Sequence, residues 1–286
     1  MKKNNLILTA MLAIALCFAA CGGSDVDVTT ILLDKTTLSL AVGDEYTLLA
    51  TVVPNNATNK KVSWASSNPA VASVAGGKIT ALSAGTTTIV ANIGDKLASC
   101  EVIVERKGVL INGVEWAKTN IDKPNTFATN PESYGMFYQW GRKTAWSEND
   151  PLKDSNGGTM WNTTHYEGTT WTAENDPSPA GWRLPTKEEL QSLLDQTKVT
   201  SVWTTQNGVN GRKFTDKTTG ANIFLPAAGW RSFSNGTLVN RGSNGFYWSS
   251  TVNNASYAYY MSIDSTAQYT DTTIKSYGFS VRCVAK

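Results

Sequence analysis

The chain has 286 residues, with 25 lysines and arginines against 23 aspartates and glutamates, which gives a formal charge of +2 at pH 7. A net charge this close to zero does not favour binding to nucleic acid, which requires an excess of basic residues. A chain of this length can form two domains with separate cores. Its low charge and its many Thr, Ser, Asn, Gly and aromatic residues are typical of exported β-rich modules rather than of a cytosolic enzyme.

The first 20 residues have the pattern of an export signal. Lys2 and Lys3 precede an apolar run from Leu6 to Ala20, and a positive start followed by such a run is typical of a secretory signal. The run has roughly 15 apolar positions, fewer than the ~20 that a membrane-spanning helix needs. Residues 1–20 are therefore predicted to be a signal peptide that is removed.

The residues around Cys21 predict a lipid anchor. Phe18-Ala19-Ala20-Cys21 resembles the bacterial lipobox, which implies that Cys21 becomes the acylated first residue of a mature lipoprotein. Ser24-Asp25-Val26-Asp27 resembles the acidic signal that sends Bacteroidetes lipoproteins to the cell surface. Since two or more acyl chains such as palmitate anchor stably, we expect residues 21–26 to tether the protein to the outer membrane, facing outward. The alternative is an ordinary secretory signal that ends in a chance cysteine.

Residues 27–104 have the pattern of an all-β sandwich. Short β-branched runs alternate with turn residues such as Pro54-Asn55-Asn56 and Gly76-Gly77, and no stretch has helical periodicity. We expect Trp64 to anchor the core. The predicted strands are 31–33, 38–40, 46–53, 62–64, 71–74, 78–81, 86–93 and 97–104.

Several motifs of this segment resemble the bacterial immunoglobulin-like group 2 (BIG2) domain. They are Val42-Gly43-Asp44, the run Val62-Ser63-Trp64-Ala65-Ser66-Ser67-Asn68-Pro69 with the adjoining Ala70-Val71-Ala72-Ser73-Val74, Gly77-Lys78-Ile79-Thr80-Ala81-Leu82 and Ala84-Gly85-Thr86. Such domains commonly serve as spacers in surface proteins. The segment has no histidine and no cluster of carboxylates, so the resemblance favours a spacer, with binding of a sugar or host protein as the alternative.

Glu105-Arg106-Lys107-Gly108 is a short charged linker, and residues 109–286 form the second predicted domain. Nine of the ten tryptophans lie there, and Gly and Asn interrupt almost every apolar run. One helix is predicted over 185–194. It begins with a capping box formed by Thr186 and Glu189, and Leu190, Leu193 and Leu194 form one apolar stripe.

The second domain resembles the Fibrobacter succinogenes major paralogous domain, which is related to the C-type lectin-like fold. The motifs are Ile111-Asn112-Gly113-Val114-Glu115-Trp116-Ala117, Tyr134-Gly135-Met136-Phe137-Tyr138-Gln139-Trp140-Gly141-Arg142-Lys143, Gly181-Trp182-Arg183-Leu184-Pro185-Thr186, Leu225-Pro226-Ala227-Ala228-Gly229, Tyr247-Trp248-Ser249-Ser250 and Gly278-Phe279-Ser280-Val281-Arg282-Cys283-Val284. The resemblance implies an α+β C-type lectin-like domain in which the helix packs on a sheet and the domain's termini lie side by side.

The mature chain keeps two cysteines, Cys100 and Cys283. They could pair across the domains in an oxidising compartment, but Cys100 alternates with Val102 and Val104 as an inward strand position, so we expect two buried, unpaired thiols. Family members often have Asp-Pro-Cys-Pro before the Gly-Trp-Arg motif, whereas this chain has Asp176-Pro177-Ser178-Pro179. The resemblance therefore implies that Cys283 lacks its usual disulfide partner.

No catalytic or metal-binding set is evident. His165 is the single histidine, and a triad requires a base fixed beside a nucleophile. Two Glu-Asn-Asp-Pro turns, at 148–151 and 174–177, could offer oxygen ligands to calcium, although solvated turns explain them as well. We therefore predict a protein that is not an enzyme, has no cofactor and binds no nucleic acid.

Two aromatic and amide-rich stretches are the candidate ligand-binding regions. The first, 141–181, is too long for an idle connection in a compact domain and carries Trp161, Tyr166 and Trp171, whose side chains can stack on sugars or fill protein pockets. The second, 252–277, has the Tyr, Ser and Asn composition of antibody paratopes. Its candidate residues are Asn253, Asn254, Ser256, Tyr257, Tyr269 and Asp271.

Together these features predict a cell-surface lipoprotein whose Ig-like spacer displays a non-catalytic domain that binds an extracellular glycan or protein. One alternative is a structural subunit or tip of a surface fibre or envelope assembly. A more remote one is a carbohydrate-active enzyme.

Overall fold

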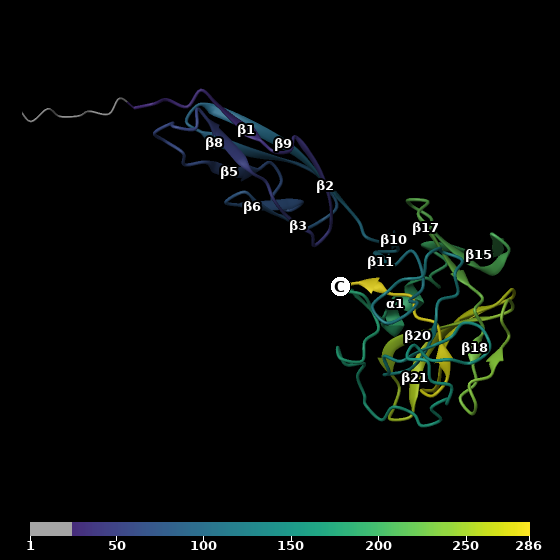
Figure 1. Ribbon diagram of the computed structural model, residues 1–286. Helices are drawn as coiled ribbons and strands as arrows, with labels where there is room; N and C mark the ends of the chain where they lie inside the picture. The colour runs from purple at the N-terminus through teal and green to yellow at the C-terminus, as the bar shows by residue number, and fades with distance from the viewer. Residues whose placement is uncertain (1–24) are drawn as a thin grey trace, which may run out of the picture.

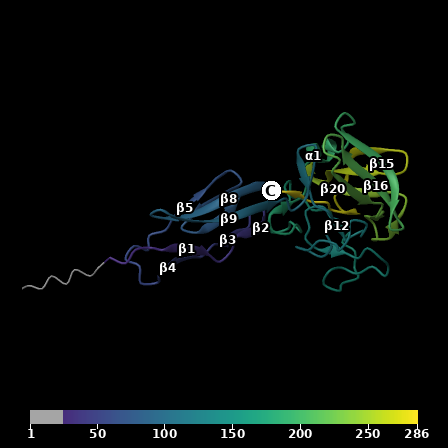
Figure 2. The ribbon, with the colours of Figure 1, turned by 90° about the horizontal axis from the view of Figure 1, so that it is seen from above.

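The structure is a computed structural model that describes residues 25–286. The predicted signal peptide and Cys21 lie outside the described residues. The described chain forms two β-rich bodies in series, joined by one short connection (Figures 1 and 2). Within residues 25–286, no helix is long and apolar enough to cross a membrane.

The first body is an immunoglobulin-like sandwich. One four-stranded sheet has the order β2-β9-β8-β5, a three-stranded sheet has the order β3-β7-β6, and β1 pairs with β4. The β2–β9 pair is parallel and the others are antiparallel. The strands are β1 (Thr30–Leu33), β2 (Thr37–Ala41), β3 (Glu45–Thr47), β4 (Ala50–Val53), β5 (Ser63–Ser66), β6 (Ala72–Ala75), β7 (Lys78–Ala81), β8 (Gly85–Ile93) and β9 (Lys96–Glu105).

Alternation along β8 and β9 builds the core of this sandwich. Cys100, Val102 and Val104 are buried while the residues between them are exposed, because successive side chains of a strand point to opposite faces. Ile89 lies opposite Cys100 in the ladder and is also fully buried. Trp64 is half-buried and packs against both apolar clusters of the domain.

The single strand predicted over 46–53 is two strands, β3 and β4, in different sheets. Leu48 is buried at the crossing, and its N–H donates to the carbonyl of Gly77. Leu49 is 60% exposed, and its N–H donates to the carboxylate of Asp34. The chain crosses from one sheet to the other at Leu48 and Leu49. Because residues on both sides of this crossing are apolar, the sequence pattern is that of one continuous strand. At Gly77, φ is +86° and a Cβ would lie 2.7 Å from the Leu48 carbonyl, so the crossing requires glycine there.

The connection between the bodies is short and bonded at both ends. β9 ends at Glu105 and β10 begins at Val109. Lys107 forms an ion pair with Asp44 of the sandwich at 3.0 Å. The N–H of Gly108 donates to the carboxylate of Glu115 in the second body at 2.8 Å. The connection therefore contacts both bodies, through an exposed ion pair on one side and a backbone hydrogen bond on the other.

The second body consists of short strands in four sheets, with long loops between them. The sheet orders are β10-β11-β24-β14, β13-β12-β23-β18-β19, β15-β16-β17 and β20-β21-β22. The strands are β10 (Val109–Ile111), β11 (Val114–Trp116), β12 (Phe137–Gln139), β13 (Ala145–Trp146), β14 (Trp182–Arg183), β15 (Val199–Gln206), β16 (Val209–Asp216), β17 (Asn222–Pro226), β18 (Trp230–Arg231), β19 (Leu238–Val239), β20 (Gly245–Val252), β21 (Tyr257–Ile263), β22 (Gln268–Ile274), β23 (Gly278–Phe279) and β24 (Val284–Ala285).

The prediction of an α+β C-type lectin-like fold for this domain is wrong. Among the described residues the α-helical content is a single six-residue helix, α1 (Lys187–Ser192). The capping box formed by Thr186 and Glu189 is present as predicted. The helix nevertheless has fewer than two turns, because after Ser192 the backbone turns at Leu193 and Leu194 and continues into β15. It covers a small part of one sheet and does not form a helical layer.

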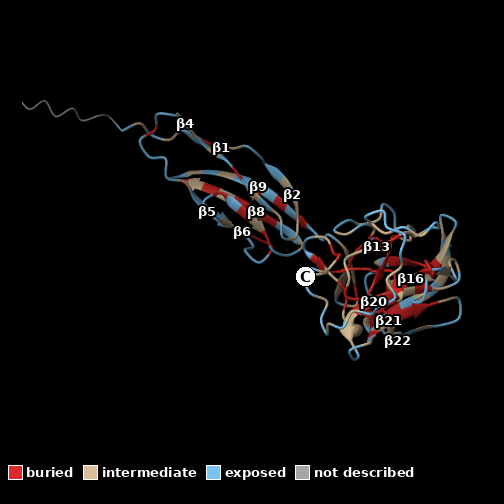
Figure 3. Cartoon of the chain, turned by 60° about the horizontal axis from the view of Figure 1, so that its bottom comes forward, coloured by how far each residue is buried: buried red, intermediate tan, exposed pale blue. Residues whose placement is uncertain are grey.

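The sheet β20-β21-β22 lies between two apolar clusters. Alternate residues of β21 point to opposite sides, with Ala258 and Tyr260 in an aromatic cluster and Met261 and Ile263 in an aliphatic one. Most residues of β21 and half of those of β20 are therefore buried (Figure 3). Both faces of β21 are therefore packed.

The termini of the second domain lie side by side. Trp116 of β11 pairs with Val284 of β24, and the C-terminus lies beside the point where the chain enters the domain (Figure 1). The fully buried Arg282 fastens the two ends. Its guanidinium donates to Asn120 Oδ1 and to the carbonyls of Ala117 and Phe224 at 2.8 to 3.2 Å.

Candidate ligand-binding surface

The three aromatic candidates of 141–181 lie against the body of the second domain. Trp171 and Tyr166 pack on the buried Trp140, with ring centroids 5.3 and 6.2 Å away. Trp161 packs on Trp146 at 4.8 Å. The indole N–H groups of Trp161 and Trp171 donate to carbonyls of the chain. All three are half-buried, so each contributes to the core as well as to the surface.

The candidates of 253–257 form an exposed turn before β21. Asn253, Asn254 and Tyr257 are exposed, with Tyr257 at 42%. The side-chain oxygen of Asn254 accepts the N–H groups of Ser256 and Tyr257, which closes the turn. This Asx geometry is what Asn favours in turns.

The structure brings these two segments together, although they lie about 90 residues apart in the sequence. Ser256 Oγ is 3.3 Å from His165 Nε2. Beneath them, the ammonium of the buried Lys275 donates to the carbonyls of Gly168 and Ala255 at 2.9 and 2.7 Å. It also lies over the ring of Trp140 at 4.5 Å. Lys275 thus fixes both segments at one edge, and its burial lowers its pKa.

Tyr269 and Asp271 lie on β22, away from Tyr257. In the ladder Tyr269 is opposite Ser262 and Asp271 is opposite Tyr260, so their side chains point to the aromatic side of the sheet. Tyr257 belongs to the alternate set of β21, which points to the other side. The nine predicted binding residues therefore do not form one surface, and their role in binding stays a prediction.

An aromatic cleft on that same side was missed by the sequence analysis. It is lined by Trp230, Phe246, Tyr260, Thr273, Tyr277 and Phe279. The lining residues lie in five segments that only the folded sheets bring together. The single signal in the sequence was an abundance of aromatic residues, which gave no indication of where they would meet.

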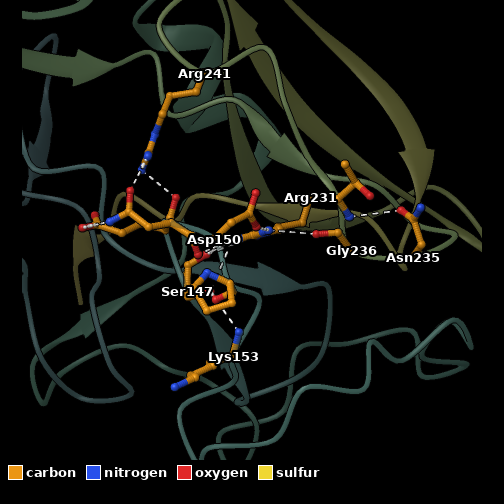
Figure 4. A network of polar contacts seen from close by, with 11 residues as sticks. Ser147, Asp150, Lys153, Arg231, Asn235, Gly236 and Arg241 are labelled. Atoms are coloured by element: carbon orange, nitrogen blue, oxygen red, sulfur yellow. Dashed lines mark hydrogen bonds and ion pairs between the residues drawn. The ribbon is translucent and has the colours of Figure 1, made fainter.

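Two arginines fix the turn at residues 147–151 (Figure 4). The fully buried guanidinium of Arg231 forms an ion pair with Asp150 at 2.6 Å and donates to the carbonyls of Ser147, Asn149 and Gly236. Arg241 donates to Asn149 Oδ1 and lies over the ring of Tyr134. The Glu-Asn-Asp-Pro turn considered as a calcium site is thus occupied by arginine contacts, and no three His, Cys, Asp or Glu side chains of residues 25–286 gather as metal ligands do.

The surroundings of the single histidine and the two cysteines of residues 25–286 are as follows. His165 lies on an exposed loop, where its one side-chain neighbour by hydrogen bonding is Ser256. Cys100 and Cys283 are buried and unpaired, as predicted. Burial raises the pKa of the Cys283 thiol to about 12, so it remains protonated at neutral pH. Its sulfur lies 3.3 Å from Ser178 Oγ, at the position where the resembling family often has cysteine.

Comparison with family models assigns both domains. Residues 27–102 match the bacterial Ig-like domain (group 2), which confirms the resemblance of the first domain. Residues 135–285, just over half of the chain, match the Lcl C-terminal domain. The chain belongs to the Lcl C-terminal domain family. The resemblance of the motifs to the Fibrobacter succinogenes major paralogous domain stays a prediction.

Curated relatives are similar to only part of the chain. The Ig-like virion protein of Serratia phage KSP90 is 41% identical over 83 residues, which are 28% of this chain and 32% of the phage protein. An uncharacterized protein of Clostridium acetobutylicum is 45% identical over 82 residues, which are 27% of this chain and 8% of that protein. The chain thus spans about a third or less of the length of these relatives.

The solved structures found by comparison are distant. Domains 5-6 of the surface layer protein SbsC have a TM-score of 0.26 and 15% identity, covering 87% of this chain and 97% of that chain. Titin domains I67-I69 have a TM-score of 0.22 and 10% identity, covering 87% and 98%. The Lcl family likeness is therefore the stronger guide to this protein.

Proposed function

We propose that the protein is a non-catalytic structural component of a bacterial surface assembly, in which the Ig-like domain holds the Lcl-family domain away from the membrane. The observation that carries the proposal is the connection at residues 105–109, which is bonded to both domains through Lys107 and Gly108. A short connection that contacts both domains suits a load-bearing arm. The Ig-like relatives include a virion protein, itself part of an assembled particle.

The arm begins, in this proposal, at a lipid on Cys21. Replacing Cys21 by Ser should move the protein from the membrane fraction to the soluble fraction and abolish incorporation of labelled palmitate. Digestion of intact cells with a protease should remove the protein if the arm faces outward. Retention of the Cys21→Ser variant in membranes would contradict the anchor.

The structural role is tested separately by the native mass of the protein. Cross-linking in intact cells followed by mass determination should recover it in a stoichiometric complex of high mass. Recovery as a solitary monomer at the surface would contradict this role and favour ligand display instead.

Binding of an extracellular glycan or protein is the second candidate, favoured by the meeting of the two aromatic and amide-rich segments above Lys275. Exposed residues are the right ones to vary, because alanine at the half-buried Trp161 or Trp171 would also remove core packing. On glycan and host-protein arrays, Asn254→Ala and Tyr257→Ala should lose binding. Val202→Ala, exposed on β15, is the control. Equal binding by all variants would contradict this site.

A further inference from the structure

The aromatic cleft of the second domain has an unusual lining. Five of its six lining residues are aromatic, and the sixth is Thr273. Trp230, Phe246 and Tyr277 are half-buried, so their rings are in part accessible from the cleft, whereas Phe279 and Tyr260 form its buried floor. Phe246 contacts Phe279 at 5.1 Å and Trp230 at 4.8 Å between ring centroids. The rings are therefore held in place by one another before any ligand arrives.

The cleft is small. Its volume is about 130 Å³, below the roughly 300 to 1,000 Å³ of pockets that hold drug-sized ligands. It suits a compact group of a few heavy atoms rather than a whole sugar ring or a folded peptide segment. The volume of the cleft therefore restricts the bound group to a small one, such as the end of a side chain or a lipid headgroup.

A free carboxylate stands beside the aromatic rings. Asp271 lies opposite Tyr260 in the ladder, and Thr273 of the cleft is two residues further along the same face of β22. The Asp271 side chain is exposed, accepts the N–H of Thr272 and forms no ion pair among the described residues. Its proximity to Tyr260 contributes, after burial and the neighbouring Tyr269, to raising the pKa of the Tyr260 hydroxyl.

The basic side chains that lie next to cleft residues along the chain form hydrogen bonds to other segments. Arg231, the strand neighbour of Trp230, is buried and bonded to the turn at residues 147–151. Lys275, two residues from Thr273, is buried and bonded to Gly168 and Ala255. The cleft thus has aromatic walls, and Asp271, opposite Tyr260 but outside the lining, places a negative charge without an ion-pair partner among the described residues next to it.

We propose that this cleft binds a methylated ammonium group of the choline type. Aromatic faces attract such cations through their quadrupole, and a desolvated contact of this kind contributes about 2 kcal/mol. The carboxylate of Asp271 adds charge complementarity, while the methyl groups fit against the ring faces of the lining residues. The proposal goes beyond the structural role of the protein, and its failure would leave the anchor and assembly experiments unaffected.

The test is a titration of the purified full chain with choline, followed by calorimetry and tryptophan fluorescence. The matched probe is 3,3-dimethylbutan-1-ol, which has the shape of choline with carbon in place of the charged nitrogen. Choline should bind at least about tenfold more tightly than this neutral isostere, a difference of about 1.4 kcal/mol. Phosphocholine and phosphatidylcholine vesicles then separate a free ligand from a lipid headgroup, and binding of either supports the cleft.

Variants assign the site. Asp271→Asn keeps the shape of the side chain and should weaken choline binding about tenfold, and Trp230→Leu should weaken it further. Glu188→Gln, an exposed acid on α1, and Val202→Ala, exposed on β15, should bind as the parent does. Since Trp230→Leu could perturb folding, Asp271→Asn decides the outcome. Equal binding of the isostere, unchanged binding by Asp271→Asn, or no binding of choline up to about 50 mM would overturn the proposal.

Discussion

In the Ig-like domain the buried side chains are almost all aliphatic, whereas the second domain also buries Arg231, Arg282, Lys275 and several tryptophans. The difference follows from the backbone. In the sandwich, long ladders such as β8–β9 pair the backbone N–H and C=O groups of neighbouring strands with each other. The second domain has ladders of similar length, such as β15–β16, but also long loops. The buried carbonyls of these loops need donors from side chains.

The buried cations of the second domain therefore act as substitutes for secondary structure. Arg282 donates to three carbonyls and Lys275 to two. The carbonyls lie 165, 164 and 58 residues from Arg282 and 107 and 20 residues from Lys275 along the chain. The comparison predicts that replacing buried charged residues lowers the stability of the second domain. Replacing buried aliphatic residues should lower the stability of the first.

The largest expected effect is that of Arg231→Met. The variant removes the ion pair to Asp150 and leaves the carbonyls of Ser147 and Gly236 without their donor. The Asp150 carboxylate is 65% exposed and is rehydrated, so the cost comes from the carbonyls that lose their donor. At about 1 to 3 kcal/mol for each such group, the variant should lose about 4 kcal/mol. Calorimetry of the full chain should show the unfolding transition of the second domain lowered and that of the Ig-like domain unchanged.

Two controls accompany this variant. Arg231→Lys keeps the charge but lacks the forked guanidinium and should lie between the parent and Arg231→Met. Lys78→Ala removes an exposed ion pair with Glu45 and should change the free energy of unfolding by less than about 0.5 kcal/mol. An unchanged second transition in Arg231→Met would break the comparison.

Ile79→Ala tests the aliphatic side of the comparison. Ile79 is fully buried in β7, and truncation of such a residue costs about 3 kcal/mol through lost burial and the cavity that remains. The expected result is a lowered transition of the Ig-like domain alone. If the second transition fell by a similar amount, the connection through Lys107 and Gly108 would have to couple the stabilities of the two domains.

Ser178→Cys should stabilise the second domain. Ser178 Oγ lies 3.3 Å from the Cys283 sulfur, so a cysteine there is placed to form a disulfide that closes a loop of about 105 residues. The expected gain is about 3 kcal/mol, lost on addition of a reductant. Thiol titration of the unfolded chain measures closure of the bond, and Ser178→Ala controls for loss of the hydroxyl. A full count of free thiols in the variant would contradict the prediction.

The sequence could predict what depends on near neighbours. Alternation placed Cys100, Val102 and Val104 in the core of the sandwich, and the Thr186 and Glu189 pair marked the helix start, because these signals lie within a few residues. The crossing at Leu48 was missed because its cause is Gly77, almost 30 residues away. The stripe of leucines likewise gave no sign that the backbone turns after Ser192 toward β15, which is why α1 is shorter than predicted.

The candidate site was predictable by residue type but not by position. Trp161 and Trp171 were recognised as candidate binding residues, yet their rings pack on Trp146 and Trp140. The cleft needs Trp230, Phe246 and Tyr277, which meet through pairings between distant strands. Such pairings cannot be predicted from one sequence, since each depends on the register of several other strands.

The smallest change in stability is expected for a substitution of Glu189, which links the start of α1 to Arg183 of β14. Its carboxylate accepts two bonds from Arg183 at 2.6 and 2.7 Å and one from the N–H of Thr186 at 2.7 Å. Burial acts to raise the pKa of Glu189, but these bonds outweigh it and hold the pKa below its usual value. The charged form is therefore the one that stabilises the folded domain.

Glu189→Gln should lower the stability of the second domain by about 1 kcal/mol at pH 7, the usual contribution of a helix cap. Because the folded pKa is the lower one, the contribution of Glu189 is complete above its unfolded pKa of about 4.3. It is lost as the pH falls through the folded value, so parent and variant should converge in urea unfolding at acidic pH. Glu188→Gln on the exposed side of α1 is the control. A constant difference between Glu189→Gln and the parent down to low pH would mean that packing, rather than the carboxylate, joins the helix to β14.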